Sequence, residues 1–132
     1  MGVRFPSVSS STFVGPLPAN ATETVICTTP PLTLPLDFAM VMLFWEWSMT
    51  SGTATTSIIM RLRRGTTVSG TLVNTNNYTI STPTAGNAYL LTGCFFDTPG
   101  AVGPIQYSLT TQQNAATGAG TNLEVALMAF AL

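Results

Sequence analysis

The sequence predicts an all-β domain, a sandwich or barrel of about eight strands. Two observations indicate this class. Apolar residues recur at every second position in several stretches, and they rarely show the spacing of three and four that marks a helix. β-branched residues are abundant, and Gly and Pro divide the chain into short segments typical of strands joined by turns.

The first half of the domain contains three predicted strands. Residues 23–29 (ETVICTT) form the first, and the prolines within residues 30–35 require an extended connection after it. Residues 38–49 form the second strand, which ends at a Ser-Gly turn, and residues 55–64 form the third before Gly65. In that third strand two faces are distinct: Ile58, Met60 and Leu62 share one, and Ile59, Arg61 and Arg63 share the other.

Five more strands are predicted in the second half. The segments are TLVNTN (71–76), NYTIST (77–82), AYLLTGCFFD (88–97), IQYSLTTQQ (105–113) and TNLEVALMAFAL (121–132). The last of them is aliphatic to its final residue, so we expect it inside a sheet and not at an edge. A terminal strand paired on both sides with distant strands is typical of a jelly roll more than of a meander. We therefore predict a single jelly-roll β-sandwich over residues 21–132.

Residues 1–20 are predicted to form an extended N-terminal arm. Pro6, Pro16 and Pro18 exclude a regular strand over the whole segment, although residues 11–14 could pair locally. Such a segment can become ordered by adding to another chain, or it can be a frayed terminus. Its hydrophobic side chains favour contact with a neighbouring copy, and the candidate contact residues are Phe5, Phe13 and Val14.

The composition indicates a protein held in an assembly. Only 7% of residues are charged, where soluble proteins average about 25%. The formal net charge is −1, so few charges are available to keep a free monomer soluble. The 45% hydrophobic content argues against disorder of the whole chain.

The same composition argues against several functions. Four basic residues are too few for a nucleic-acid backbone site. His is absent, the two Cys match no metal or redox spacing, and no nucleophile or cofactor motif is present, so we expect no enzyme, metal site or cofactor. The unbroken apolar run 38–45 is far shorter than the span of about 20 residues that a membrane requires.

The segment FAMVMLFWEWSMT (38–50) is the first candidate site, because both faces of this strand are apolar. A strand in a two-layer sandwich has one inner face, so we predict that a second subunit covers the other, with Trp45, Glu46 and Trp47 in the contact. The alternative is that a loop or the arm covers it within one chain.

Glu46 needs a partner if it is buried there. Arg61 or Arg63 would serve if strands 38–49 and 55–64 formed a hairpin. In a jelly roll these strands belong to different sheets, and the pair would have to form between subunits. The alternative is a charge exposed to solvent. The cluster Arg61, Arg63 and Arg64 fits an acidic partner surface, or else a charged edge that prevents strand-to-strand aggregation.

Cys27 and Cys94, with Trp45 between them, resemble the immunoglobulin arrangement, which would require a disulfide. The spacing fits that fold poorly, and we favour free buried thiols. A second alternative function comes from Asn74, Asn76, Asn77 and Tyr78. Such a cluster, if it lies on a loop, would suit a tail-fibre or lectin-like module that binds glycans.

A resemblance to a known family is carried by the stretch TSIIMRLRRGTTVSGTLV, the DTPG turn at 97–100 and the aliphatic last strand. In these features residues 23–132 resemble small jelly-roll capsid decoration (cement) proteins of tailed bacteriophages. These proteins are trimers with a tumour-necrosis-factor-like topology. The resemblance implies a homotrimeric structural virion protein on the capsid exterior. It also implies contact with the major capsid protein or other shell subunits, with the arm across a neighbour.

Overall fold

In the computed structural model, the described residues are 8–15, 22–34, 40–50, 56–80, 87–100, 102–113 and 123–132. They form ten strands, and no helix among them is long and apolar enough to cross a membrane. The strands are β1 (Val8–Gly15), β2 (Thr24–Thr28), β3 (Leu32–Leu34), β4 (Val41–Thr50), β5 (Thr56–Arg64), β6 (Thr71–Ile80), β7 (Ala88–Asp97), β8 (Gly103–Ile105), β9 (Tyr107–Gln113) and β10 (Leu123–Ala131).

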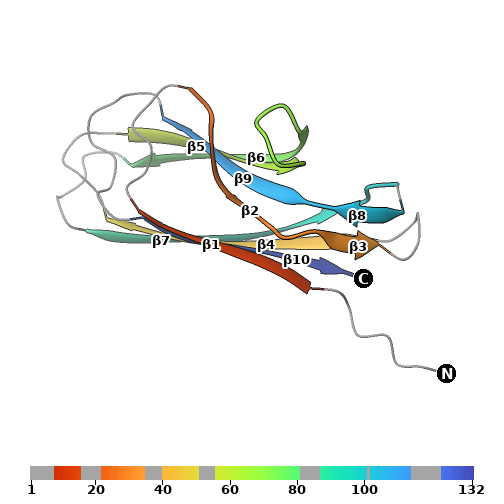
Figure 1. The fold of residues 1–132 in the computed structure, drawn as a ribbon. Helices are drawn as coiled ribbons and strands as arrows, with labels where there is room; N and C mark the ends of the chain where they lie inside the picture. Colours follow the sequence, from red (N-terminus) through yellow and green to blue (C-terminus); the bar gives the residue numbers. More distant parts are fainter. Residues whose placement is uncertain are drawn as a thin grey trace.

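The strands form two four-stranded antiparallel sheets that stack as layers (Figure 1). One sheet has the order β1-β10-β4-β7 and the other β2-β9-β5-β6, while β3 and β8 make a small pair near the C-terminus. The successive strands β4 and β5 lie in different sheets, and β10 is enclosed between β1 and β4. This order confirms the predicted all-β jelly-roll sandwich and the internal position of the last strand.

The core lies between the two sheets and follows the pleat of the strands. In β4 every second side chain points inward, so Val41, Leu43, Trp45 and Trp47 are buried. The facing sheet contributes Ile58, Met60 and Leu62, which the alternation in 55–64 placed on one face of the strand. Tyr107, Leu109, Val125, Leu127 and Ala129 complete the centre of the core.

Part of the predicted arm belongs instead to the domain. Residues 8–15 form β1, which pairs along its whole length with β10 of the same chain, from Val8 opposite Phe130 to Gly15 opposite Leu123. The prediction of an exchanged arm is therefore wrong for this segment. The prolines that suggested an arm flank the segment VSSSTFVG and do not interrupt it, so every peptide N–H within it remains available for pairing.

The positions of the three arm residues follow from this strand. Phe13 and Val14 lie on β1, at the register of Val125 and Glu124 of β10. Phe5 lies outside the described residues. Two other boundaries differ from the prediction: residues 71–80 form one continuous strand, and the β3–β8 pair was not predicted. β3 is only three residues long and has prolines close by, which explains why its signal was weak.

Gly93 lies at the centre of β7, opposite Trp45 of β4. A Cβ atom built on Gly93 would lie 2.0 Å from Cζ2 of Trp45 and 2.5 Å from Cε2. The indole ring therefore occupies the space that a side chain at position 93 would need. This pair explains why a strand interior, where glycine is normally unfavourable, carries one here.

Candidate functional site

The outward side of the β1-β10-β4-β7 sheet carries two consecutive rows of apolar side chains. In one row Met42 of β4 lies between Phe130 of β10 and Phe96 of β7. In the next, Phe44 lies between Met128 and Cys94. We call this group the outer apolar face; it consists of Met42, Phe44, Cys94, Phe96, Met128 and Phe130.

None of these six side chains is buried by the described part of the chain. Phe96 is 51% exposed and Cys94 is also exposed, while the other four are half-buried. Exposed Met40 and Leu132 extend the apolar surface at the same end of the sheet, where the N–H of Leu132 donates to the carbonyl of Met40. Contiguous exposed apolar patches are typical of interaction sites.

The outer apolar face gives way to polar residues along the same strands. The third row contains Glu46 between Ala126 and Thr92, and the fourth contains Ser48 between Glu124 and the exposed Leu90. The surface is therefore amphipathic along the strand direction. Its apolar half lies toward the C-terminus and the start of β1 (Figure 1).

Trp45 and Trp47 do not belong to this surface. They are 2% and 0% exposed and lie in the core of their own chain, so their predicted place in a subunit contact is wrong. The prediction that β4 has two apolar faces is correct, but the tryptophans occupy the inner one. The periodicity of the strand could not show which face is inward, because both faces are apolar. The pleat shows only that alternate residues lie on opposite faces of the sheet.

Glu46 is exposed on the outward side of β4. Neither Arg61 nor Arg63 pairs with it, because β5 lies in the other sheet. The hairpin that would have paired Glu46 with an arginine of the same chain is not formed, and the alternative of a charge exposed to solvent describes the structure.

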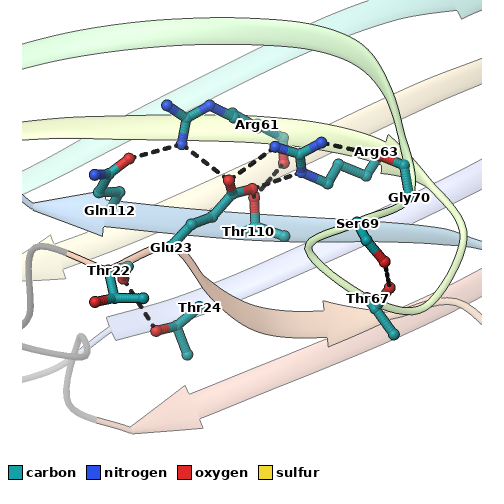
Figure 2. Close-up of polar contacts among 10 residues, drawn as sticks. All are labelled: Thr22, Glu23, Thr24, Arg61, Arg63, Thr67, Ser69, Gly70, Thr110 and Gln112. Atoms are coloured by element: carbon teal, nitrogen blue, oxygen red, sulfur yellow. Dashed lines mark hydrogen bonds and ion pairs between the residues drawn. The ribbon is translucent and has the colours of Figure 1, made fainter.

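Arg61 and Arg63 instead meet Glu23 on the outward side of the second sheet, and Figure 2 shows this cluster. Arg63 binds the Glu23 carboxylate through two nitrogens, with Nε 2.6 Å from Oε1 and Nη2 2.8 Å from Oε2. Nη1 of Arg61 lies 3.3 Å from Oε2 of Glu23 and donates to Gln112 at 3.0 Å. The hydroxyl of Thr110 also donates to the carboxylate.

These contacts weaken both interpretations of the arginine cluster. The guanidinium groups of Arg61 and Arg63 are engaged within the chain, and Arg63 additionally donates to the carbonyl of Gly70. They are not free anchors for an acidic partner in this structure. They also do not protect an edge, because β5 lies between β9 and β6.

The charged hydrogen bonds from Arg63 hold the pKa of Glu23 below its usual value of 4.5, helped by Thr110 and Arg61 and opposed by partial burial. A depressed pKa means that the carboxylate stabilises the fold above pH 4.5 and that this contribution is lost as the pH falls below it. We expect the wild-type free energy of unfolding to fall between about pH 6 and about pH 3 more steeply than that of Glu23→Gln. Urea unfolding at the two pH values measures this difference. Glu46→Gln should keep the wild-type slope, and an equal slope in Glu23→Gln would contradict the assignment.

Arg64, the third predicted contact residue, connects the two sheets. Its Nη2 lies 2.6 Å from Oδ1 of Asp97 and its Nε 3.0 Å from Oδ2. The Tyr107 hydroxyl donates to Oδ2 of the same carboxylate at 2.7 Å. Burial and the neighbouring Asp97 raise the pKa of Tyr107, so its phenol remains a donor. Asp97 ends β7 in one sheet, whereas Arg64 and Tyr107 belong to the other, and we call this group the inter-sheet clasp.

The two cysteines are free and lie in different sheets. Cys27 is buried in the core, and burial raises its pKa to about 11. Cys94 is exposed on the outer apolar face. The disulfide required by the immunoglobulin interpretation is absent from the structure, and the preferred prediction of free thiols is confirmed, although only Cys27 is buried.

The predicted glycan cluster lies on a strand and not on a loop. Asn74, Asn76, Asn77 and Tyr78 are part of β6, and Tyr78 packs against the core. Side chains that alternate along a strand point to opposite faces, so these four do not form one surface. Among the described residues no group of three or more His, Cys, Asp or Glu could hold a metal ion.

Comparison with known proteins identifies the fold. No family model and no curated protein match the chain. The solved structures that match include the T13 particle of infectious bursal disease virus, with a TM-score of 0.61 and 12% identity over 96% of this chain. The VP2 subviral particle of the same virus matches with a TM-score of 0.60 and 13% identity over 95% of this chain. The structure of the Gx strain of this virus matches with a TM-score of 0.58 and 14% identity over 96% of this chain. This chain spans 31–32% of those chains, and the likeness is one of fold.

Proposed function

We propose that the chain is a structural protein of a virion, which assembles with copies of itself or with other shell subunits. The observation that carries the proposal is the outer apolar face, two rows of apolar side chains on the outward side of a complete sandwich. The similarity in fold to subunits of virus particles supports the same role. In this role the chain has no catalytic activity and needs no cofactor.

The physical basis of assembly is burial of this face. Each 100 Å² of apolar surface removed from water contributes about 2.5 kcal/mol, so a modest contact suffices when it is repeated around a closed shell. Phe44 and Phe96 carry rigid aromatic rings, and Met42 and Met128 have flexible side chains that adapt to an opposing surface. Such a combination suits a contact among subunits.

Within that role we propose the arrangement implied by the resemblance noted above. The chain would act as a decoration or cement protein on the exterior of a bacteriophage capsid, as a homotrimer in contact with the major capsid protein. Phe5 and the rest of residues 1–7 would contact a neighbour, because β1 begins beside the outer apolar face. Negative-stain electron microscopy of shells with and without the chain would test the exterior position.

Phe44→Ser should weaken assembly without unfolding the domain. The substitution removes a half-buried ring from the centre of the outer apolar face, where loss of about 1.5–3 kcal/mol per contact corresponds to roughly a 10- to 100-fold weaker association. Native mass spectrometry and sedimentation velocity over a dilution series measure the shift toward monomer.

Asn77→Ser is the matched control, because Asn77 is exposed on β6 in the other sheet. It should leave the oligomer distribution unchanged. A wild-type chain that stays monomeric at high concentration, or an equal shift in both variants, would contradict the proposed role.

A further inference from the structure

Strand β7 forms one edge of its sheet. It pairs with β4 through all ten residues from Ala88 to Asp97, and no other described strand pairs with its second side. An edge strand of this length presents a row of backbone N–H and C=O groups to any chain that can add a strand.

β7 lacks the features by which proteins usually block such an edge. It contains no Lys, Arg or Pro, and its one charged residue, Asp97, is buried in the inter-sheet clasp. Its outward side chains are all exposed, and the two large ones, Leu90 and Phe96, are 63% and 51% exposed. This edge is therefore apolar, uncharged and open in the described structure.

The edge strand β6 of the second sheet differs. Its sequence TLVNTNNYTI carries Asn or Thr at six of ten positions, and its pairing with β5 shifts register between Leu62 and Arg63. Polar side chains and an irregular register reduce the tendency of an edge to pair. Of these two edge strands, β6 is thus polar and β7 is apolar.

We propose that β7 pairs antiparallel with β7 of a second copy of this chain across a two-fold axis. The two four-stranded sheets would then form one continuous sheet. In a two-fold contact each outward residue of one strand meets another outward residue of the second copy, and the outward positions 90, 92, 94 and 96 carry no charge that would be placed against a like charge. This self-contact rests on the proposed virion role, and it can fail without that role failing.

The pleat restricts the register of this pairing. Outward side chains must lie opposite outward side chains. One residue of β7 must therefore lie directly opposite its own copy, with the two-fold axis between them. An axis at Gly93 places Leu90 opposite Phe96 of the second copy and Thr92 opposite Cys94 of the second copy. An axis at Thr92 would place Phe96 opposite Ala88 of the second copy. The first register joins the two large exposed side chains of β7 and is the one we propose.

Thr92→Cys tests the contact directly. In the proposed register the introduced thiol lies opposite the native Cys94 of the second copy, and directly opposed Cβ atoms are about 4.5–5.5 Å apart. We expect mild oxidation, or a short bis-maleimide, to convert most of the purified protein to a covalent dimer. Thr79→Cys on β6, at the exposed edge of the other sheet, is the matched control. It should form no covalent dimer, which a gel run without reducing agent shows.

Two further variants separate the possible outcomes. The double variant Thr92→Cys, Cys94→Ser should lose the cross-link. A cross-link that persists in this variant would have to join the two copies of Cys at position 92, which requires an axis at position 92 and would overturn the proposed register. Thr92→Lys should raise the dimer dissociation constant at least 10-fold while Thr79→Lys does not, with unchanged melting by circular dichroism in both. Failure of Thr92→Cys to cross-link more than Thr79→Cys would overturn the inference, whereas a positive Phe44→Ser result would still support the virion role.

Discussion

Gly93→Ala is expected to destabilise the domain by about 3 kcal/mol, near the upper range for overpacking a core. The added methyl group would lie 2.0 Å from Cζ2 of Trp45, well inside contact distance. Trp45 is 2% exposed and packed on all sides, so its ring cannot move away without displacing other core side chains. Urea unfolding monitored by tryptophan fluorescence measures the loss.

Gly100→Ala provides the control for this substitution. Gly100 has a φ of 66°, and no atom lies within 4 Å of the position that a Cβ would take, so only backbone strain of about 1 kcal/mol is expected. In a Trp45→Phe background the cost of Gly93→Ala should fall, because the smaller ring leaves room, and the double-mutant cycle gives the coupling energy. Equal costs for the two Gly→Ala changes would contradict the steric explanation.

Asp97→Ala is expected to cost about 3 kcal/mol, because it breaks the inter-sheet clasp. The substitution leaves the buried Tyr107 hydroxyl without its acceptor and the Arg64 guanidinium without its paired charge. It also removes a side-chain link between the sheets at the end of β7. Thermal and urea unfolding measure the loss.

Glu46→Ala removes a carboxylate from the same sheet at an exposed position and should change stability by less than about 0.5 kcal/mol. Tyr107→Phe should recover part of the cost of Asp97→Ala in the double variant, since no hydroxyl then remains unsatisfied. If Asp97→Ala and Glu46→Ala had similar effects, the clasp would not be a stabilising element.

Local pattern was sufficient to predict much of the fold. The alternation in 55–64 correctly put Ile58, Met60 and Leu62 on one face, which the structure buries in the core, and the aliphatic last strand was correctly placed inside a sheet. The prediction failed where the sequence pattern does not show which face of a strand is buried. Both faces of β4 are apolar, so the sequence could not show that Trp45 and Trp47 lie inside, and the prolines around β1 concealed a regular strand between them.

The polar contacts could not be predicted, because they join residues far apart in the sequence. Glu23 and Arg63 are separated by 40 positions and Arg64 and Asp97 by 33, and only the strand order brings them together. One signal for the outer apolar face was present in the sequence. Met40, Met42 and Phe44 alternate with the buried set, and the side of β4 without tryptophan is the one left uncovered.

The internal pairing of Glu23 with Arg63 and of Asp97 with Arg64 also determines how copies meet in solution. With those charges compensated at short range and a formal net charge of −1, the domain has almost no long-range electric field. Encounters are then governed by diffusion and shape, without electrostatic steering, and ionic strength has little to screen. In the proposed virion role, such a subunit would join a growing shell at similar rates in dilute and concentrated electrolyte.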